Sequence, residues 1–386
     1  MFTKRMLAMG MTACLLSAAA LLPPAILLPT AAIAADPLRI GLFGPMSGER
    51  SALGTRFREA AVMYADEVNE AGGIDGRQLE IQAEDSRGQP REAANIAQKF
   101  AQDPTVLAVI GGQTSTESMA AAPILSDAGL TQVSPTASHP DYSTMSDYQF
   151  RISNTQATIS QVHADMLVGT LGFKRIAIIY FQDDWGAYVN SSTTERVVDM
   201  GAEVVLAEAM VPEGRDYRAL VTKVLAAEPD GIFLASHYAE SAVFVQQLRQ
   251  AAPDMPIAAT DTLNDPKFIE LAGAAADGVV MPTPFLPSAA EAAAFSEAYQ
   301  ARFDKVPDYY SAFAYDAVMV IAEAMKEVAA SGGEITRAAV RDAIAGAEAR
   351  AGVSGRIHYD ANGDPEMREM SLITIEGGKY TAYPPS

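Results

Sequence analysis

The chain has 386 residues, of which 49% are hydrophobic and 20% are charged, a composition typical of a globular protein with enough length for two domains. Its formal net charge is −20. Because so acidic a chain repels phosphate groups, nucleic acid and anionic lipid are excluded as expected partners. Cys14 is the only cysteine in the sequence, which excludes a zinc site built from several thiolates and a disulfide within the chain.

The N-terminal segment has the pattern of a secretory signal peptide. Lys4 and Arg5 precede an apolar run over 6–33, and this run ends in the small residues Ala32-Ile33-Ala34-Ala35. A basic start, an apolar centre and a small-residue exit are the features that export and cleavage require. We therefore expect residues 1–35 to be removed and the protein to be periplasmic. The remaining chain would carry 26 basic and 48 acidic residues, a net charge of −22.

Two other interpretations of this segment remain open. The apolar run is long enough to span a bilayer as an uncleaved anchor, although Pro23, Pro24 and Pro29 would interrupt its helix. Thr12-Ala13-Cys14 resembles the end of a lipobox, but the residues after Cys14 stay apolar where the tether of a lipoprotein should be polar.

From Leu38 onward, short apolar runs alternate with stretches of helical periodicity. The runs predict strands at 38–43, 79–84, 106–110 and 131–134, separated by helices at 52–71, 91–102 and 115–128. Strands that are apolar throughout are typical of a parallel sheet buried on both faces. The alternating order favours a doubly wound α/β domain with right-handed crossovers.

The same alternation then begins again and predicts a second sheet. Its strands are expected at 175–180, 204–207, 231–235, 257–260 and 278–281, and its helices at 155–171, 185–200, 216–227, 240–251 and 266–272. A proline-rich crossing at 281–287 leads to helices at 289–303, 309–330 and 336–345 and to strands at 356–359 and 369–375. We therefore expect a two-lobed α/β protein, each lobe a mostly parallel sheet flanked by helices.

The sequence lacks the motifs of catalysis and metal binding. It contains no G-x-G-x-x-G, no P-loop, no G-x-S-x-G and no H-E-x-x-H. The four histidines, at 139, 163, 237 and 358, do not have the spacing of metal ligands. We expect a binding protein without a cofactor or metal, and not an enzyme.

Small polar residues follow four of the predicted strands. They are Met46-Ser47, Gln113-Thr114-Ser115-Thr116, Thr136-Ala137-Ser138 and Thr260-Asp261. In open α/β sheets, ligands bind beyond the carboxyl ends of the strands. Helix capping explains any one of these groups by itself. Their convergence on one crevice indicates a ligand site.

The residue types in this crevice indicate an α-amino acid. At 106–123 a strand leads through two glycines to a helix start, whose free N–H groups bind anions. Because 111–118 contains no Lys or Arg, a single carboxylate suits this position better than a phosphate. Asp261, in the second lobe, would balance an ammonium group on the same small molecule.

Seven segments of the sequence stand in a specific order and spacing: LRIGLFGPMSG (38–48), DEVNEAGGIDGRQLEI (66–81), VIGGQTSTES (109–118), TQVSPTAS (131–138), RIAIIYFQDDWGAYV (175–189), PEGRDYRALVTKVLAAEPDGIFL (212–234) and TDTLNDPKFIELAGAAADGVV (260–280). With them the chain resembles the leucine/isoleucine/valine-binding protein family, the amino-acid-binding branch of the type I periplasmic binding proteins. The resemblance covers nearly all of the sequence after residue 35.

The resemblance implies two lobes joined by three crossing strands, which close on a ligand. It places lobe 1 at 36–156 plus 285–354 and lobe 2 at 157–284 plus 355–386. It also implies a monomeric carrier that captures an amino acid (branched-chain or related) and delivers it to an ABC transporter permease in the inner membrane.

The resemblance further implies roles for individual residues. By position, Ser115 and Ser138 match the hydroxyls that hold the ligand carboxylate. Thr136 matches a position whose backbone carbonyl accepts from the ligand ammonium, and Asp261 matches an acid that pairs with the same ammonium.

Departures from the family pattern leave the identity of the ligand open. They concern candidate ligand-binding residues around the ligand's side chain: Arg50, Leu53, Gln113, Trp185, His237 and Tyr238. Trp185 is interpreted either as an aromatic lid or as ordinary packing, and Arg50 either contacts a second carboxylate or is solvated. The open alternatives are an amide, a urea-like molecule or an aromatic carboxylate as ligand, and a ligand sensor for a signalling partner.

Overall fold

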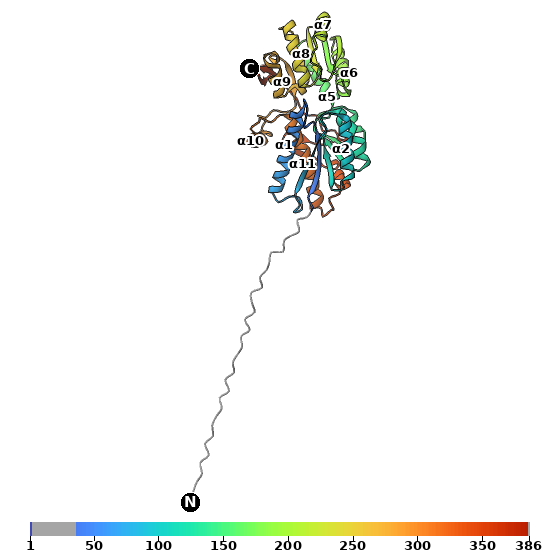
Figure 1. The fold of residues 1–386 in the computed structure, drawn as a ribbon, viewed down its shortest axis with the longest axis vertical. Coiled ribbons are helices and arrows are strands. Elements are labelled where there is room, and N and C mark those ends of the chain that lie inside the picture. The colour runs from blue at the N-terminus through green and yellow to red at the C-terminus, as the bar shows by residue number, and fades with distance from the viewer. Residues whose placement is uncertain (2–35, 385–386) are drawn as a thin grey trace. The chain divides into compact units, whose positions relative to one another are not determined.

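The computed structural model describes residues 36–384 together with Met1. The expected signal peptide and the possible lipid attachment at Cys14 lie outside the described residues. Figure 1 shows two groups of strands, each surrounded by helices. In the part of the chain that the structure describes, no helix combines the length and the apolar character that a membrane crossing needs.

The first sheet has five parallel strands in the order β2-β1-β3-β4-β5. They are β1 (Leu38–Gly44), β2 (Leu79–Asp85), β3 (Val106–Ile110), β4 (Thr131–Ser134) and β5 (Gln149–Arg151). One face packs against α1 (Ser51–Glu70), α11 (Tyr309–Ala330) and α12 (Arg337–Ala345), and the other against α2 (Pro90–Gln102) and α3 (Ser115–Asp127). The short α4 (Asp141–Thr144) follows β4.

The second sheet has seven strands in the order β14-β13-β10-β9-β8-β6-β7. They are β6 (Arg175–Phe181), β7 (Glu203–Met210), β8 (Gly231–Ala235), β9 (Ile257–Ala259), β10 (Val280–Thr283), β13 (Ser371–Glu376) and β14 (Lys379–Ala382). β13 and β14 run antiparallel, so this sheet is mostly but not entirely parallel.

Helices cover both faces of the second sheet as well. α5 (Gln156–Ala164), a π-helical turn at Asp165–Thr170 and α6 (Asp184–Asp199) lie on one face. The other face carries α7 (Arg218–Ala226), α8 (Tyr238–Ala251) and α9 (Pro266–Ala272). Short 3-10 turns occupy Asp261–Leu263 and Gly273–Ala276, α10 (Ala293–Phe303) precedes α11, and a hairpin of β11 (Arg350–Gly352) and β12 (Gly355–Ile357) follows α12.

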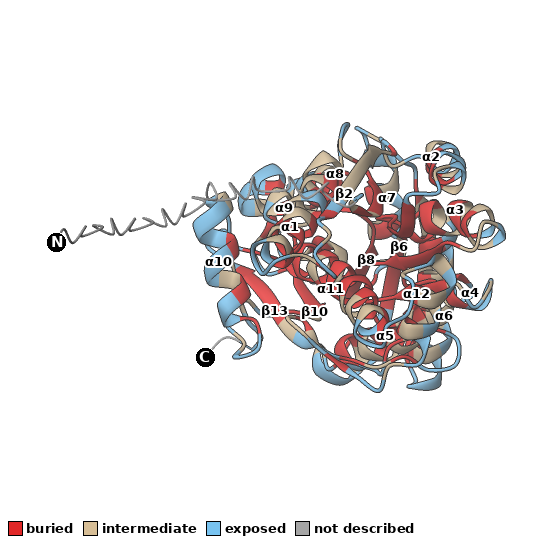
Figure 2. Ribbon diagram, turned by 90° about the horizontal axis from the view of Figure 1, so that it is seen from below, coloured by how far each residue is buried: buried red, intermediate tan, exposed pale blue. Residues whose placement is uncertain are grey.

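Burial explains why the apolar runs form central strands. All five residues of β3 and of β8 are buried, and successive side chains of β8 belong to opposite cores. Figure 2 shows the strands mostly red and the outer faces of the helices exposed. The expected two-lobed fold is therefore confirmed.

Three strands were not predicted from the sequence: β5, β11 and β14. β5 has the sequence Gln-Phe-Arg, and Arg151 is buried because its guanidinium pairs with Asp364 and donates to Ser143 and to backbone carbonyls. β14 is a half-exposed edge strand without an apolar run.

The chain passes between the two lobes three times, after β5, after β10 and after β12. This number agrees with the three crossings of the expected hinge. The exact lobe boundaries, 36–156 plus 285–354 and 157–284 plus 355–386, stay a prediction.

Candidate ligand-binding site

A cavity lies where the carboxyl ends of strands from both sheets meet. Seven of the ten predicted site residues line it: Gln113, Ser115, Thr136, Ser138, Trp185, His237 and Asp261. The cavity has a volume of about 40 Å³, whereas one water needs roughly 10–15 Å³. The space therefore suits a small molecule and not a polymer.

The first wall of the cavity is the N-terminus of α3, which local interactions hold in place. Thr114 Oγ1 accepts from the N–H of Glu117 at 3.1 Å, and Glu117 Oε2 accepts from the N–H of Thr114 at 3.2 Å. This capping box fixes the first turn. The glycines before it are required by close approach, since a Cβ on Gly111 would lie 2.6 Å from Phe43.

The hydroxyl of Ser115 is available to a ligand. It lies in the first turn of α3, and its Oγ accepts from the N–H of His139 at 3.1 Å. Because this contact uses a lone pair, the hydroxyl proton remains free to donate. Together with the free N–H groups of the helix start, it forms a place for one carboxylate.

Ser138 and Thr136 are held by other protein groups. Ser138 Oγ donates to Gln156 Oε1 at 3.2 Å, and Thr136 Oγ1 donates to the Gln113 carbonyl at 2.7 Å. Gln156 Oε1 also accepts from Trp185 Nε1 at 3.2 Å. The indole is 6% exposed, so Trp185 is a fixed part of the wall in this structure.

Asp261 provides the negative charge of the cavity. It begins the 3-10 turn after β9, and burial raises its pKa to about 7, although backbone N–H groups of the turn oppose this shift. No Lys or Arg in residues 36–384 forms an ion pair with this carboxylate, and none contributes to its pKa. The cavity therefore has an acid that lacks a cation from the protein.

Aromatic rings form much of the remaining wall. The rings of Trp185 and His237 stack with centroids 5.3 Å apart, and Phe181 meets His237 edge-on at 4.8 Å. Tyr309 and Tyr310, at the start of α11, line the cavity with their centroids 4.0 Å apart. The sequence did not predict these two tyrosines as site residues. The sequence around them indicates only that a helix begins after Asp308, and this does not predict that the two side chains reach the cavity.

The other three predicted site residues do not line this cavity. Leu53, near the start of α1, is fully buried in the core. The Tyr238 hydroxyl donates to the Glu49 carbonyl at 2.5 Å. Arg50 Nη1 donates to Gln113 Oε1 at 3.4 Å, and its guanidinium lies 5.7 Å from the centre of the Phe181 ring. A role for these three residues in ligand binding stays a prediction.

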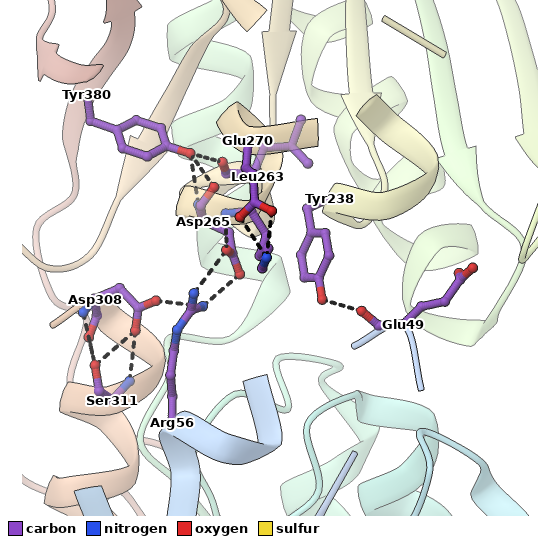
Figure 3. A network of polar contacts seen from close by, with 10 residues as sticks. Glu49, Arg56, Tyr238, Leu263, Asp265, Glu270, Asp308, Ser311 and Tyr380 are labelled. Carbon is purple, nitrogen blue, oxygen red and sulfur yellow. Dashed lines mark hydrogen bonds and ion pairs between the residues drawn. The ribbon is translucent and has the colours of Figure 1, made fainter. Parts of the chain in front are cut away.

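A second polar region connects the two lobes near the cavity, and we call it the Arg56 cluster. Arg56 of α1 donates to both carboxylate oxygens of Asp265, at 2.7 and 3.1 Å, and pairs with Asp308 at 2.8 Å. Figure 3 shows the guanidinium between the two acids, with the Tyr380 hydroxyl donating to carbonyls of the Asp265 segment. Burial opposes the charge of Arg56, but Asp308 and Asp265 outweigh it and raise the arginine pKa.

The described residues contain no cluster of His, Cys, Asp and Glu that could hold a metal ion. In the cavity, Ser115 Oγ contacts the backbone of His139, and the ring of His237 stacks on Trp185. The arrangement can bind a ligand through charge and hydrogen bonds.

Residues 37–379 match the model of a family described as periplasmic binding protein. The chain belongs to this family, whose members are substrate-binding proteins of transporters. It is 26% identical over 338 residues to the leucine-, isoleucine-, valine-, threonine- and alanine-binding protein of Pseudomonas aeruginosa, a match that covers 86% of this chain and 88% of the relative.

Solved structures agree with this assignment. The branched-chain amino acid transporter substrate-binding protein LivJ of Streptococcus pneumoniae, in complex with isoleucine, superposes with a TM-score of 0.83 and 28% identity over 90% of this chain and 98% of its own. A solute-binding protein of an ABC transporter from R. palustris, in complex with benzoate, has a TM-score of 0.81 and 21% identity over 90% of this chain and 95% of its own. The second likeness shows the fold alone.

Proposed function

We propose that this protein captures a small α-amino acid in the cavity and delivers it to an ABC transporter permease in the inner membrane, as a monomeric periplasmic carrier. The observation that carries the proposal is the pairing of opposite chemistries across the cavity. The start of α3 with Ser115 suits a carboxylate, and Asp261 lacks a cation. An α-amino acid supplies both charges on neighbouring atoms.

The energetic reason is that the ligand completes both sites at once. Its ammonium would give Asp261 the charge partner that the described residues do not provide, and this repays part of the cost of a buried carboxylate. Its carboxylate would receive the Ser115 proton and the free N–H groups of α3. Binding would then favour the closed arrangement of the two lobes, which the permease recognises.

The named ligands of similar proteins support an amino acid. The Pseudomonas aeruginosa relative is named for five amino acids, and the Streptococcus pneumoniae structure contains isoleucine.

An aromatic carboxylate is the second candidate. The benzoate complex of the R. palustris protein and the aromatic wall around Trp185, Tyr309 and Tyr310 favour it. Such a ligand has no ammonium and would need Asp261 to be protonated, which raises the cost of binding above pH 7.

Thermal unfolding of the purified protein with a panel of amino acids, amides, urea and benzoates tests this choice. A ligand of micromolar affinity at millimolar concentration stabilises the native state by about 4 kcal/mol, which is a shift of several degrees. We expect α-amino acids to give this shift and their deaminated analogues to give none. A shift with benzoates but not with amino acids would overturn the proposal.

A further inference from the structure

Arg56 makes an ion pair that crosses from one lobe to the other. It lies on α1, which packs against the first sheet, and it donates to both carboxylate oxygens of Asp265, in the segment between β9 and α9 of the second lobe. The Asp265 side chain is fully buried, and that of Arg56 is 13% exposed. Because water cannot replace either partner at such a place, the pair fixes how closely the two lobes approach there.

A second acid holds Arg56 within the first lobe. Asp308, at the start of α11, pairs with Arg56 Nη1 at 2.8 Å. This pair does not cross the lobe boundary, since α1 and α11 pack against each other over the first sheet. Figure 3 shows the guanidinium between the two acids. Asp308 therefore belongs to the body of the first lobe that presents Arg56 to the second.

Both acids adjoin residues that line the ligand cavity. Asp265 comes four residues after Asp261, and Asp308 immediately precedes Tyr309. Burial raises the pKa of Tyr309 well above its ordinary value, and the nearby charge of Asp261 contributes to this shift. Arg56 thus holds together two segments that form neighbouring parts of the cavity wall, although it does not line the cavity itself.

The turn that carries Asp261 is rigidly connected to Asp265. The N–H of Asn264 donates to the Asp261 carbonyl at 2.9 Å. The Tyr380 hydroxyl donates to the carbonyls of Leu263 and Asp265, at 2.6 and 2.8 Å. A turn tied in this way moves as one body, so the position of Asp265 determines the position of Asp261.

We propose that Arg56 is a positioning residue for ligand binding: it holds Asp265 of the second lobe against the first and thereby places Asp261 across the cavity from the start of α3. Without this pair, the buried carboxylate of Asp265 would have no cation, and separation of the lobes would give it water. Apparent affinity falls with the fraction of molecules in the arrangement that binds. The pair therefore regulates affinity without touching the ligand. This inference deepens the proposed function and rests on it.

Two matched variants separate the contact between the lobes from the contact within one lobe. Asp265→Asn and Asp308→Asn each remove one of the two carboxylates that hold Arg56. Both keep a helix cap, because Asp265 accepts from the N–H of Lys267 and Asp308 from the N–H of Ser311, and asparagine caps as well as aspartate does. Only Asp265→Asn breaks the contact between the lobes.

The first measurement is the distance between the lobes, and it needs no ligand. Spin labels are attached to cysteines introduced by Arg91→Cys in α2 and Arg218→Cys in α7, in a Cys14→Ser background. Both arginine side chains are exposed, and they lie on different lobes. We expect Asp265→Asn to shift the distances in the ligand-free protein to longer values, and Asp308→Asn to leave them unchanged.

The second measurement is isothermal titration with isoleucine, the amino acid bound in the Streptococcus pneumoniae structure. Asp265→Asn should weaken binding by roughly tenfold, because fewer molecules hold the lobes together, whereas Asp308→Asn should change it by less than about twofold. Saturating isoleucine should return the distances in Asp265→Asn to those of the unmodified protein. Both variants should lose stability in urea, so stability alone does not produce the difference in affinity.

The possible outcomes separate the two proposals. Unchanged distances in Asp265→Asn, or an equal shift in Asp308→Asn, would overturn the inference and leave an amino-acid carrier standing. Longer distances without a loss of affinity would overturn the role of Arg56 in binding. If neither isoleucine nor another amino acid binds at millimolar concentration, the proposed function fails, while the distances still decide whether Arg56 holds the lobes together.

A further variant keeps the test decisive if Asp265→Asn does not fold. Arg56→Lys retains the charge but lacks the two parallel donors with which a guanidinium holds a carboxylate. It should also lengthen the distance between the labels in the ligand-free protein. Distances equal to those of the unmodified protein would overturn the inference.

Discussion

Asp261 and Asp265 lie four residues apart in the segment between β9 and α9, and both belong to polar regions where the two lobes meet. Asp265 is fully buried, and Arg56 of the other lobe supplies two hydrogen bonds and a charge. Asp261 faces the cavity without a cation from the described chain. The comparison distinguishes an acid that the fold itself satisfies from one whose partner must come from outside.

This contrast indicates how a ligand site can be recognised inside a well-packed protein. Buried polar groups normally have partners, because an unpaired group costs free energy. The Arg56 cluster follows this rule, since the buried Asp265 pairs with Arg56, which lies 209 residues earlier in the sequence. In the cavity the half-buried Asp261 has no cation from the described residues, and the ammonium of a ligand would supply one.

The largest effect should come from breaking the Arg56 cluster. Arg56→Met leaves the buried carboxylates of Asp265 and Asp308 without a cation, and removal of one partner from a buried pair costs about 3–5 kcal/mol. Urea unfolding measures the loss. Arg39→Met is the control, since its pair with Glu80 is partly exposed and such pairs contribute about 1 kcal/mol or less. Equal losses in both variants would contradict the special role of the cluster.

Titration of Asp261 should give the next largest effect. The ammonium of an amino acid requires the ionised carboxylate, and the pKa of Asp261 in the ligand-free protein is about 7. Affinity should therefore rise about tenfold per pH unit between pH 5 and 7, about 2.7 kcal/mol in total, and level off above. Isothermal titration across this range measures it, and Asp261→Asn should bind weakly with no such slope. A flat profile for the unmodified protein would contradict the ammonium assignment.

The raised pKa of Asp261 also predicts how the stability of the ligand-free protein depends on pH. The folded pKa of about 7 lies above the ordinary value of 3.8, so folding disfavours the charged form. The destabilisation by the charged form of Asp261 is absent below pH 3.8, and it lowers the free energy of unfolding as the pH rises from about 4 to 7. Asp261→Asn should therefore be more stable than the unmodified protein at pH 8 and lose this advantage at pH 4. Asp265→Asn should be destabilised, because it breaks a pair that Arg56 completes.

Ser115→Ala tests the opposite end of the cavity. Removing the hydroxyl takes one donor from a desolvated carboxylate, so affinity should fall by about 1–3 kcal/mol, roughly fivefold to 150-fold. Isothermal titration of an amino-acid ligand measures the change. Ser126→Ala is the control, because Ser126 lies near the other end of α3, where its hydroxyl donates to the Pro123 carbonyl. A loss smaller than twofold in Ser115→Ala would contradict the carboxylate assignment.

The sequence predicted the features that depend on neighbours along the chain. The strand at 106–110, the two glycines and the helix start at Ser115 all follow from a buried apolar run, close backbone approach and a capping box within four residues. The gathering of seven candidate residues around one cavity follows because parallel strands end at the same edge of a sheet.

The features that were not predicted depend on contacts between distant segments. Tyr309 and Tyr310 reach the cavity because α11 packs against the first sheet from a position after the second. The pairing of Arg56 with Asp265 has no local signal, so the sequence could not tell which of the two acids would be free to meet a ligand. Arg151 in β5 is likewise buried only through partners such as Asp364.

The smallest effect should come from the hydroxyl of Tyr238, which joins the lobes through the Glu49 carbonyl (Figure 3). Tyr238→Phe should weaken ligand binding by about 1 kcal/mol, close to fivefold, because we expect a hydrogen bond that joins the lobes to stabilise the closed arrangement alone. Tyr217→Phe is the control, since the Tyr217 hydroxyl donates to the Val211 carbonyl at 2.9 Å within the second lobe. The control should lose a similar free energy of unfolding and keep its affinity. If each variant loses stability and keeps its affinity, the contact at Tyr238 stabilises the fold and does not report lobe closure.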